Sequence, residues 1–176
     1  IIPMPGNPDI VYVFQIHTEP NAGSNASTNY DSLYYSLVDL TGNNGQGSII
    51  LNLQLFSNET LNNNIAVTKH ANGRDYWLVA RKHMSNKYVS FNIKPGGVVD
   101  TVHSIAGPPT AVDSSIGIQS RGLKFSPNGR WLADNTFDTD TLRLLNFNAQ
   151  TGIVSDSDIL FIPDAGYMLQ PWRIAF

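Results

Sequence analysis

Short apolar runs recur along the chain, and polar stretches rich in glycine, asparagine and proline separate them. The runs are rich in β-branched and aromatic residues, which is typical of β-strands. No segment shows the sustained apolar period of about 3.6 residues that marks an amphipathic helix. The pattern therefore predicts an all-β protein with little or no helix. Strands are expected at residues 10–16, 33–40, 49–56, 65–67, 76–80, 87–93, 98–105, 123–125, 131–133, 142–148 and 159–162.

Several polar segments interrupt this pattern. Residues 1–9 contain prolines and a glycine and show little periodicity, so they are expected to precede the first strand without joining a sheet. Residues 19–28 read as a loop and residues 42–47 as a turn, because both are rich in glycine and asparagine or proline.

Two segments repeat one strand–turn–strand pattern. Residues 67–80 and 123–133 each place Asn-Gly-Arg between an apolar strand and a strand that begins with aromatic residues. Asn128 lies 128 − 72 = 56 residues after Asn72. Asn-Gly favours a tight hairpin turn in which both central residues have positive φ. A hairpin repeated about every 50 residues indicates the blades of a β-propeller.

The predicted strands group into four-stranded units that match propeller blades. Blades are predicted at residues 10–56, 65–107 and 122–163, with the start of another at 172–176, in one partial β-propeller domain over residues 1–176. This gives about three to three and a half blades, whereas closed propellers have typically four to eight. An open ring leaves backbone groups bare at its edge strands. The chain is therefore expected to be a fragment of a larger ring, completed by the remainder of its own propeller or by a partner chain.

Charge and cysteine content exclude several classes of protein. The formal net charge is -3 and the 11 Lys and Arg residues are scattered, so the sequence lacks the clustered cations that bind nucleic acid. The chain has no cysteine, which excludes disulfides and cysteine nucleophiles within it. It also has no apolar run of about 18 residues that would form a membrane span.

One acidic segment offers hard oxygen ligands of the kind that calcium prefers. Asp134, Asp138 and Asp140 are interspersed with Asn and Thr over residues 134–140. The segment lacks the glycine and the distal glutamate of an EF-hand loop. Asp, Asn and Thr are also common in turns, because their side chains hydrogen-bond to the backbone. The segment is therefore either a calcium site or a solvated turn, and no other cofactor is indicated.

Three tryptophans stand near the repeated hairpins. Trp77 and Trp131 are expected at equivalent places in the two hairpins, and Trp172 at the start of the next repeat. Stacked sheets need bulky side chains between them, and a buried aromatic typically covers about 150–250 Å². These residues are therefore expected to pack between blades. The alternative is an exposed platform for binding carbohydrate.

The order of the motifs resembles a known family. Residues 33–39 (LYYSLVD), 66–79 (AVTKHANGRDYWLV) and 125–133 (FSPNGRWLA) are similar to the amino-terminal WD40-like or TolB-like β-propeller of large secreted Bacteroidetes proteins. Those proteins carry a carboxy-terminal sorting or gliding-motility-associated domain for type 9 secretion. The resemblance implies a propeller that is secreted or displayed at the cell surface, contact with the type 9 secretion machinery, and no established catalytic residues.

These observations favour a non-enzymatic propeller that serves as a binding or scaffold module and recognises a protein or a glycan. No HExxH or GxSxG motif is present, so no catalytic residue is predicted. The alternative is a lactonase-like or other hydrolytic propeller with a metal in its central channel. A further hypothesis is a structural spacer within a large adhesin.

Overall fold

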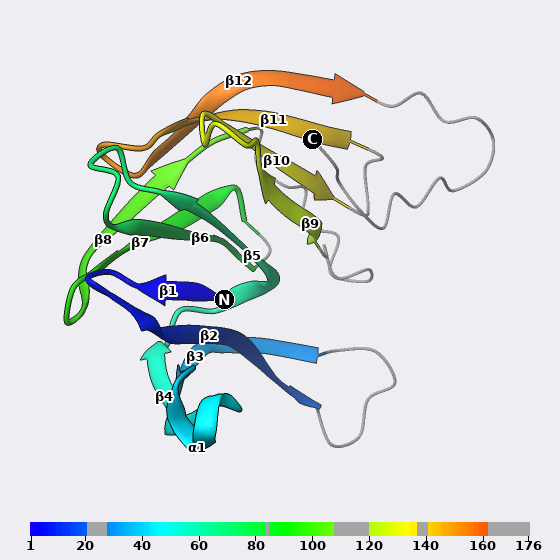
Figure 1. Cartoon of the computed structure of the whole chain (residues 1–176). Helices are drawn as coiled ribbons and strands as arrows, with labels where there is room; N and C mark the ends of the chain where they lie inside the picture. The colour runs from blue at the N-terminus through cyan, green and yellow to red at the C-terminus, as the bar shows by residue number, and fades with distance from the viewer. Residues whose placement is uncertain (21–27, 84, 108–119, 137–140, 162–176) are drawn as a thin grey trace.

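The computed structural model describes residues 1–20, 28–83, 85–107, 120–136 and 141–161, and this part of the chain is all-β (Figure 1). Its strands form three four-stranded antiparallel sheets, in which the strand order follows the chain. Sheet A contains β1 (Ile2–Met4), β2 (Asn7–Pro20), β3 (Thr28–Asp39) and β4 (Ser48–Ser57). Sheet B contains β5 (Leu61–Lys69), β6 (Tyr76–Lys82), β7 (Lys87–Lys94) and β8 (Gly97–Ile105). Sheet C contains β9 (Ser120–Phe125), β10 (Trp131–Thr136), β11 (Thr141–Asn148) and β12 (Ile153–Phe161).

The predicted all-β class is confirmed, and some boundaries differ from those expected. Residues 1–9 were expected outside the sheets, yet Ile2–Met4 forms β1, and Ile2 pairs with Tyr12 of β2. Pro3 argued against a strand at this place in the sequence. A proline is nevertheless tolerated on an edge strand, because its position without an N–H can lie on the side that has no neighbouring strand. The turn expected at 42–47 contains the helical turn α1 (Gly42–Gly45). The predicted repeat at 172–176 lies outside the described residues.

The two Asn-Gly hairpins share one turn geometry, which is not the predicted one. The amide of Gly73 donates to the carbonyl of His70, and that of Gly129 to the carbonyl of Ser126, both at 2.9 Å. Gly73 has φ +72 and Gly129 has φ +69, whereas the preceding asparagines are not in the left-handed region. This is a type I turn with glycine at its last position. The prediction of positive φ at both central residues was therefore wrong.

The asparagine side chain explains why the connection is wider than a two-residue turn. Asn72 Oδ1 accepts hydrogen bonds from the backbone amides of Arg74 and Asp75, each at 3.0 Å. Asn128 Oδ1 accepts in the same way from the amide of Arg130 at 3.1 Å. Asparagine readily bonds to the backbone two residues on, so here it stabilises the residues after the glycine instead of adopting positive φ itself.

Substitution of the two turn glycines should separate backbone strain from inter-sheet contact. Both Gly73→Ala and Gly129→Ala force alanine into positive φ, at a cost of roughly 1–2 kcal/mol. A Cβ on Gly129 would also lie 2.4 Å from Thr68 Oγ1 on β5 of the neighbouring sheet, whereas nothing lies within 4 Å of one on Gly73. Urea unfolding should therefore show a larger loss for Gly129→Ala, and Thr68→Ala should remove the excess. Equal losses would contradict a tightly packed turn.

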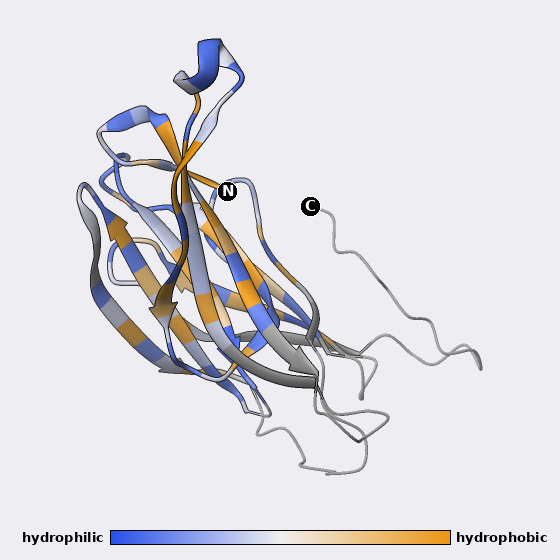
Figure 2. Cartoon of the chain, turned by 90° about the horizontal axis from the view of Figure 1, so that it is seen from below, coloured by the Kyte–Doolittle hydropathy of each residue, from blue (hydrophilic) through white to orange (hydrophobic). Residues whose placement is uncertain are grey.

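Sheet B lies between sheets A and C. Strands β2 and β3 of sheet A contact β5, β5 contacts β9, and β8 contacts β12. Hydrophobic and hydrophilic residues are interspersed along the strands (Figure 2), and successive side chains alternate between the two sides of a sheet. The alternation gives each sheet two distinct faces. The inward faces meet in two separate cores, one between A and B and one between B and C.

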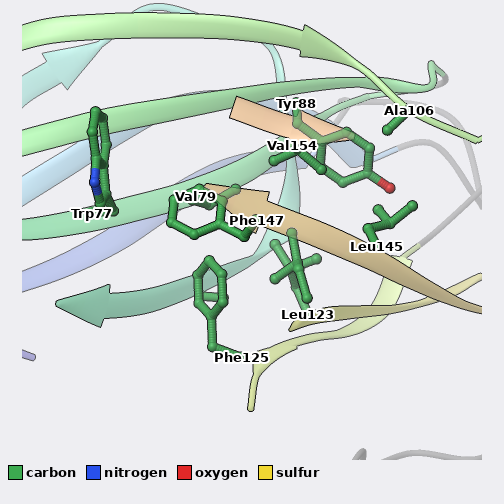
Figure 3. Close-up of a cluster of buried hydrophobic side chains, with 11 residues drawn as sticks. Trp77, Val79, Tyr88, Ala106, Leu123, Phe125, Leu145, Phe147 and Val154 are labelled. Carbon is green, nitrogen blue, oxygen red and sulfur yellow. The ribbon is translucent and has the colours of Figure 1, made fainter. Parts of the chain in front are cut away.

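The two cores differ in chemistry. Between sheets A and B, aromatic rings meet edge to face, with Phe14 to Phe56 at 4.9 Å and Phe56 to Phe91 at 5.2 Å between ring centroids. Between sheets B and C, Val154, Leu145 and Ala106 lie around the Tyr88 ring (Figure 3). The second core also contains charged side chains, which are described in the next subsection.

Turns of neighbouring sheets lie against each other at one end of the stack. The β5–β6 turn of sheet B lies against the β11–β12 turn of sheet C, where the Ala71 amide donates to the Ala149 carbonyl at 3.0 Å. The β1–β2 turn of sheet A likewise lies against the β7–β8 turn of sheet B, where a Cβ on Gly6 would be 3.9 Å from Pro95. The first turn of one sheet thus lies near the last turn of the next in both cases, whereas the strand contacts differ, because β5 contacts β9 of sheet C but β2 and β3 of sheet A.

Candidate functional site

Four buried polar side chains meet between sheets B and C, and we call them the buried polar cluster. They are Arg81, Tyr88, Asp134 and Arg143. Arg81 and Tyr88 form a cross-strand pair on β6 and β7, and Asp134 and Arg143 form one on β10 and β11. The exposed fraction is 0% for the first three residues and 3% for Arg143. Charged residues are rarely this buried unless they are paired.

Strand alternation places this cluster. Arg81 follows Trp77 and Val79 at alternate positions of β6, so it lies on the face of sheet B that packs against sheet C. Asp134 follows Leu132 in the same way on the opposing face of sheet C. The apolar core therefore gives way to charged groups where β6 and β10 continue beyond it.

The carboxylate of Asp134 joins the two sheets. Its Oδ2 accepts a hydrogen bond from Arg81 Nη1 at 2.9 Å and one from the Tyr88 hydroxyl at 2.6 Å. Arg81 Nε also donates to the Ser85 carbonyl at 2.8 Å. Burial raises the pKa of Tyr88 well above its ordinary value, and the neighbouring Asp134 charge raises it further. Tyr88 therefore stays neutral at physiological pH and acts as a hydrogen-bond donor to the carboxylate.

This arrangement bears on the predicted calcium ligands. Of that set, Asp134 is described, and its Oδ2 is bound by Arg81 and Tyr88. Asp138 and Asp140 lie outside the described residues. Within the described residues, no group of three or more His, Cys, Asp or Glu side chains is placed to hold a metal ion. A calcium site at 134–140 remains a prediction, and the observed role of Asp134 is an inter-sheet ion pair.

Trp77 packs between sheets B and C, as expected for an inter-sheet aromatic. It is 2% exposed, and its indole Nε1 donates to the Ala149 carbonyl at 2.8 Å. The indole lies against the β11–β12 turn so closely that a Cβ on Gly152 would be 2.5 Å from the ring. The ring also stacks on His70, with centroids 5.5 Å apart. A carbohydrate platform at Trp77 is therefore wrong, because its ring is not accessible.

Trp77 and Trp131 are not equivalent in the two repeats. In sheet B the His70 amide donates to the Asp75 carbonyl at 2.8 Å. In sheet C the Ser126 amide donates to the Trp131 carbonyl at 2.9 Å. Trp131 therefore corresponds to Asp75, and Trp77, two residues further on, corresponds to Ala133. Trp131 is half-buried. Trp172 lies outside the described residues.

Sheet A presents apolar side chains on the face that points away from sheet B. Tyr12 of β2 packs in the core between sheets A and B, so its neighbour Val11 points the other way. Val11 pairs with Val38 of β3, which pairs with Ile49 of β4, giving one apolar row across three strands. We call this surface the outer face. It contains Val11, Val13, Tyr34, Val38, Ile49 and Leu55.

The outer face is most exposed at strand β4. The exposed fraction is 65% for Ile49 and 57% for Leu55. Large aliphatic side chains gathered on one exposed surface are typical of protein interaction sites. The residue pattern predicts strand β4 but not this surface. The available signal was that residues 48–57 contain no charged side chain and no proline, which are the usual protections of an edge strand.

Comparison of the chain with protein-family models and with curated proteins finds no match. None of the helical structure in the described part of the chain is long and apolar enough to span a membrane.

Proposed function

We propose that the chain is part of a β-propeller in which sheets A, B and C are consecutive blades. The support is the repeated contact between the first turn of one sheet and the last turn of the next. Tyr76 of sheet B faces sheet A, and the equivalent Leu132 of sheet C faces sheet B. A constant rotation between successive four-stranded sheets closes into a ring when enough blades follow one another.

In this proposal another blade covers the outer face of sheet A. In a repeating stack, this face corresponds to the face of sheet B that packs on sheet A. It also corresponds to the face of sheet C that packs on sheet B. Both of those faces are buried and mainly apolar, and the face of sheet C also carries Asp134 and Arg143. The outer face carries the same kind of side chain, while Ile49 is 65% exposed. This exposed apolar surface is the observation that carries the proposed function.

The proposed function is a non-enzymatic scaffold that recognises protein, within a protein that is secreted or displayed at a bacterial cell surface. The aliphatic character of the outer face favours a protein partner over a glycan, because sugar rings bind best to exposed aromatic platforms and Trp77 is buried. The surface location and the use of type 9 secretion are proposed from the family resemblance of residues 33–39, 66–79 and 125–133.

Lysine substitutions on the outer face should act differently in two contexts. In the 176-residue chain, Ile49→Lys and Leu55→Lys should change the free energy of unfolding by less than about 0.5 kcal/mol, because both side chains are exposed. In the protein as its gene encodes it, each should cost about 1–3 kcal/mol, because a charge is placed between blades. Ile105→Lys on β8 is the matched control, since Ile105 is 68% exposed. Equal effects in the two contexts would contradict a covering blade.

Activity and binding screens test the function itself. Metal analysis with a panel of lactones and esters should show neither a stoichiometric metal nor turnover, and a glycan array should show no saturable binding. Turnover that follows a bound metal would replace the proposal with a hydrolytic propeller. Saturable glycan binding that survives Ile49→Lys would replace the protein partner with a carbohydrate.

A further inference from the structure

We propose that Arg143 forms a buried binding site for an oxyanion, meaning a carboxylate, sulfate or phosphate group, between sheets B and C. Arg143 lies on β11 and is 3% exposed. Its Nε and Nη1 atoms are buried and have no hydrogen-bond partner among the residues that the structure describes. A guanidinium group stays charged in proteins, and a buried charge is tolerated when it is paired and hydrogen-bonded. The geometry therefore points to an acceptor of negative charge at this side chain.

The cross-strand carboxylate is already engaged by other donors. Asp134 is the cross-strand neighbour of Arg143, but its Oδ2 accepts from Arg81 Nη1 and from the Tyr88 hydroxyl. Among the described residues, Asp134 forms its ion pair with Arg81 and not with Arg143. Arg81 and Tyr88 thus engage Asp134, and Asp156, a further described carboxylate on this side, accepts from the Gly107 amide instead of from Arg143. The local surroundings favour an additional anion.

The backbone of Gly107 covers one side of the guanidinium. A Cβ on Gly107 would lie 3.2 Å from Arg143 Nη1 and 3.3 Å from its Cδ, and Gly107 has φ +77. The Gly107 carbonyl accepts from Asn86 Nδ2 at 2.9 Å, and its amide donates to Asp156 Oδ1. Two side chains therefore hold this glycine against Arg143. With the Nη1 side covered, the Nε edge is left for the ligand, where Nε–H is a buried donor without a described partner.

One ligand chemistry fits this edge, and it has two sources. A free anion such as sulfate, phosphate or acetate has the required oxygens, and so does a carboxylate of this protein from outside the described residues. This inference does not depend on the proposed propeller, because it rests on the contact between sheets B and C alone.

The first arm of the experiment tests the free anions. The Tm of the 176-residue chain is measured against millimolar sodium sulfate, phosphate or acetate, with sodium chloride keeping the ionic strength constant. At these concentrations the general exclusion of sulfate from protein surfaces is small. A bound anion should raise Tm by about 3–5 °C for each tenfold increase beyond its Kd. Arg143→Met should abolish the rise, and Arg130→Met, at an exposed turn position, should leave it unchanged.

The second arm tests the protein's own carboxylates. Each acidic side chain outside the described residues is replaced by its amide, both in the wild-type chain and in the Arg143→Met chain. If a carboxylate of the chain is the ligand, one such substitution lowers Tm in the wild type and has no effect in Arg143→Met. Free anions then have no effect on either chain.

A response in either arm supports the site and identifies its source. The proposal is overturned if free anions leave the wild-type Tm unchanged and no carboxylate is coupled to Arg143. If Arg143→Met does not fold, Arg143→Lys replaces it, since lysine keeps the charge but lacks the planar guanidinium and its Nε–H donor. The anion response of the wild type should then weaken at least several-fold in Arg143→Lys.

Discussion

Replacing Asp134 with alanine is expected to destabilise the chain by about 3–5 kcal/mol at pH 7. The substitution removes the carboxylate that Arg81 and Tyr88 share, and all three side chains have an exposed fraction of 0%. Arg81 then loses the charge partner that compensates its desolvation. Urea unfolding, followed by tryptophan fluorescence, gives the free energy directly. The Arg81–Asp134 pair joins sheets B and C, so their contact should weaken first.

Two companion variants establish that pairing is the cause. Asp9→Ala removes an exposed carboxylate and should change stability by less than about 0.5 kcal/mol. The double variant Arg81→Met with Asp134→Leu replaces the charged pair by apolar side chains and should recover most of the loss, because a buried ion pair is often no better than a packed apolar one. A loss below 1 kcal/mol for Asp134→Ala, roughly that of a surface substitution, would mean that the pair is not buried in solution.

Trp77→Ala should also cost about 3–5 kcal/mol, the usual range for a large buried aromatic. The indole fills the space between β6 and the β11–β12 turn, where it contacts Phe147 edge to face at 6.2 Å and lies against Gly152. Its removal leaves a cavity and also leaves the Ala149 carbonyl without its 2.8 Å hydrogen bond from Nε1. Thermal unfolding and urea unfolding should both report the loss.

Trp131→Ala is the matched control for Trp77→Ala, because Trp131 is a half-buried tryptophan in the equivalent hairpin of sheet C. It should cost roughly 1–2 kcal/mol. Trp77→Phe should fall between the wild type and Trp77→Ala, since it keeps a ring but not the Nε1 donor. If Trp131→Ala proves as damaging as Trp77→Ala, then sheet C is covered on its other face and the assignment of Trp131 needs revision.

Local patterns in the sequence predicted the strands well. The apolar runs at 76–80 and 87–93 coincide closely with β6 and β7, because alternation and β-branched residues act within a single strand. The turn type was missed because Asn-Gly was considered alone. In this chain the bonds of Asn72 to the two residues after Gly73 favour a wider type I turn. The β1 strand was missed because Pro3 suggested a break.

Contacts between sheets were much harder to predict. Arg81 and Asp134 are 53 residues apart, and nothing near either residue identifies its partner. In the sequence Asp134 appeared to belong with Asp138 and Asp140 as a possible ligand set, because spacing along the chain was the available guide. Only the stacking of sheets B and C brings Asp134 to Arg81. The outer face was missed for a similar reason, since alternation shows that a strand has two faces but not which one is covered.

The difference between the two cores has a thermal consequence. Aromatic packing, as between Phe14 and Phe56, loses strength on cooling because the hydrophobic effect weakens. The desolvation cost of a buried ion pair, as between Arg81 and Asp134, falls on heating. The middle sheet is therefore held by one joint that is apolar and by a second joint that adds a buried ion pair to an apolar core of its own. Both joints weaken on cooling, and the ion pair makes the joint to the third sheet the better suited to warmth.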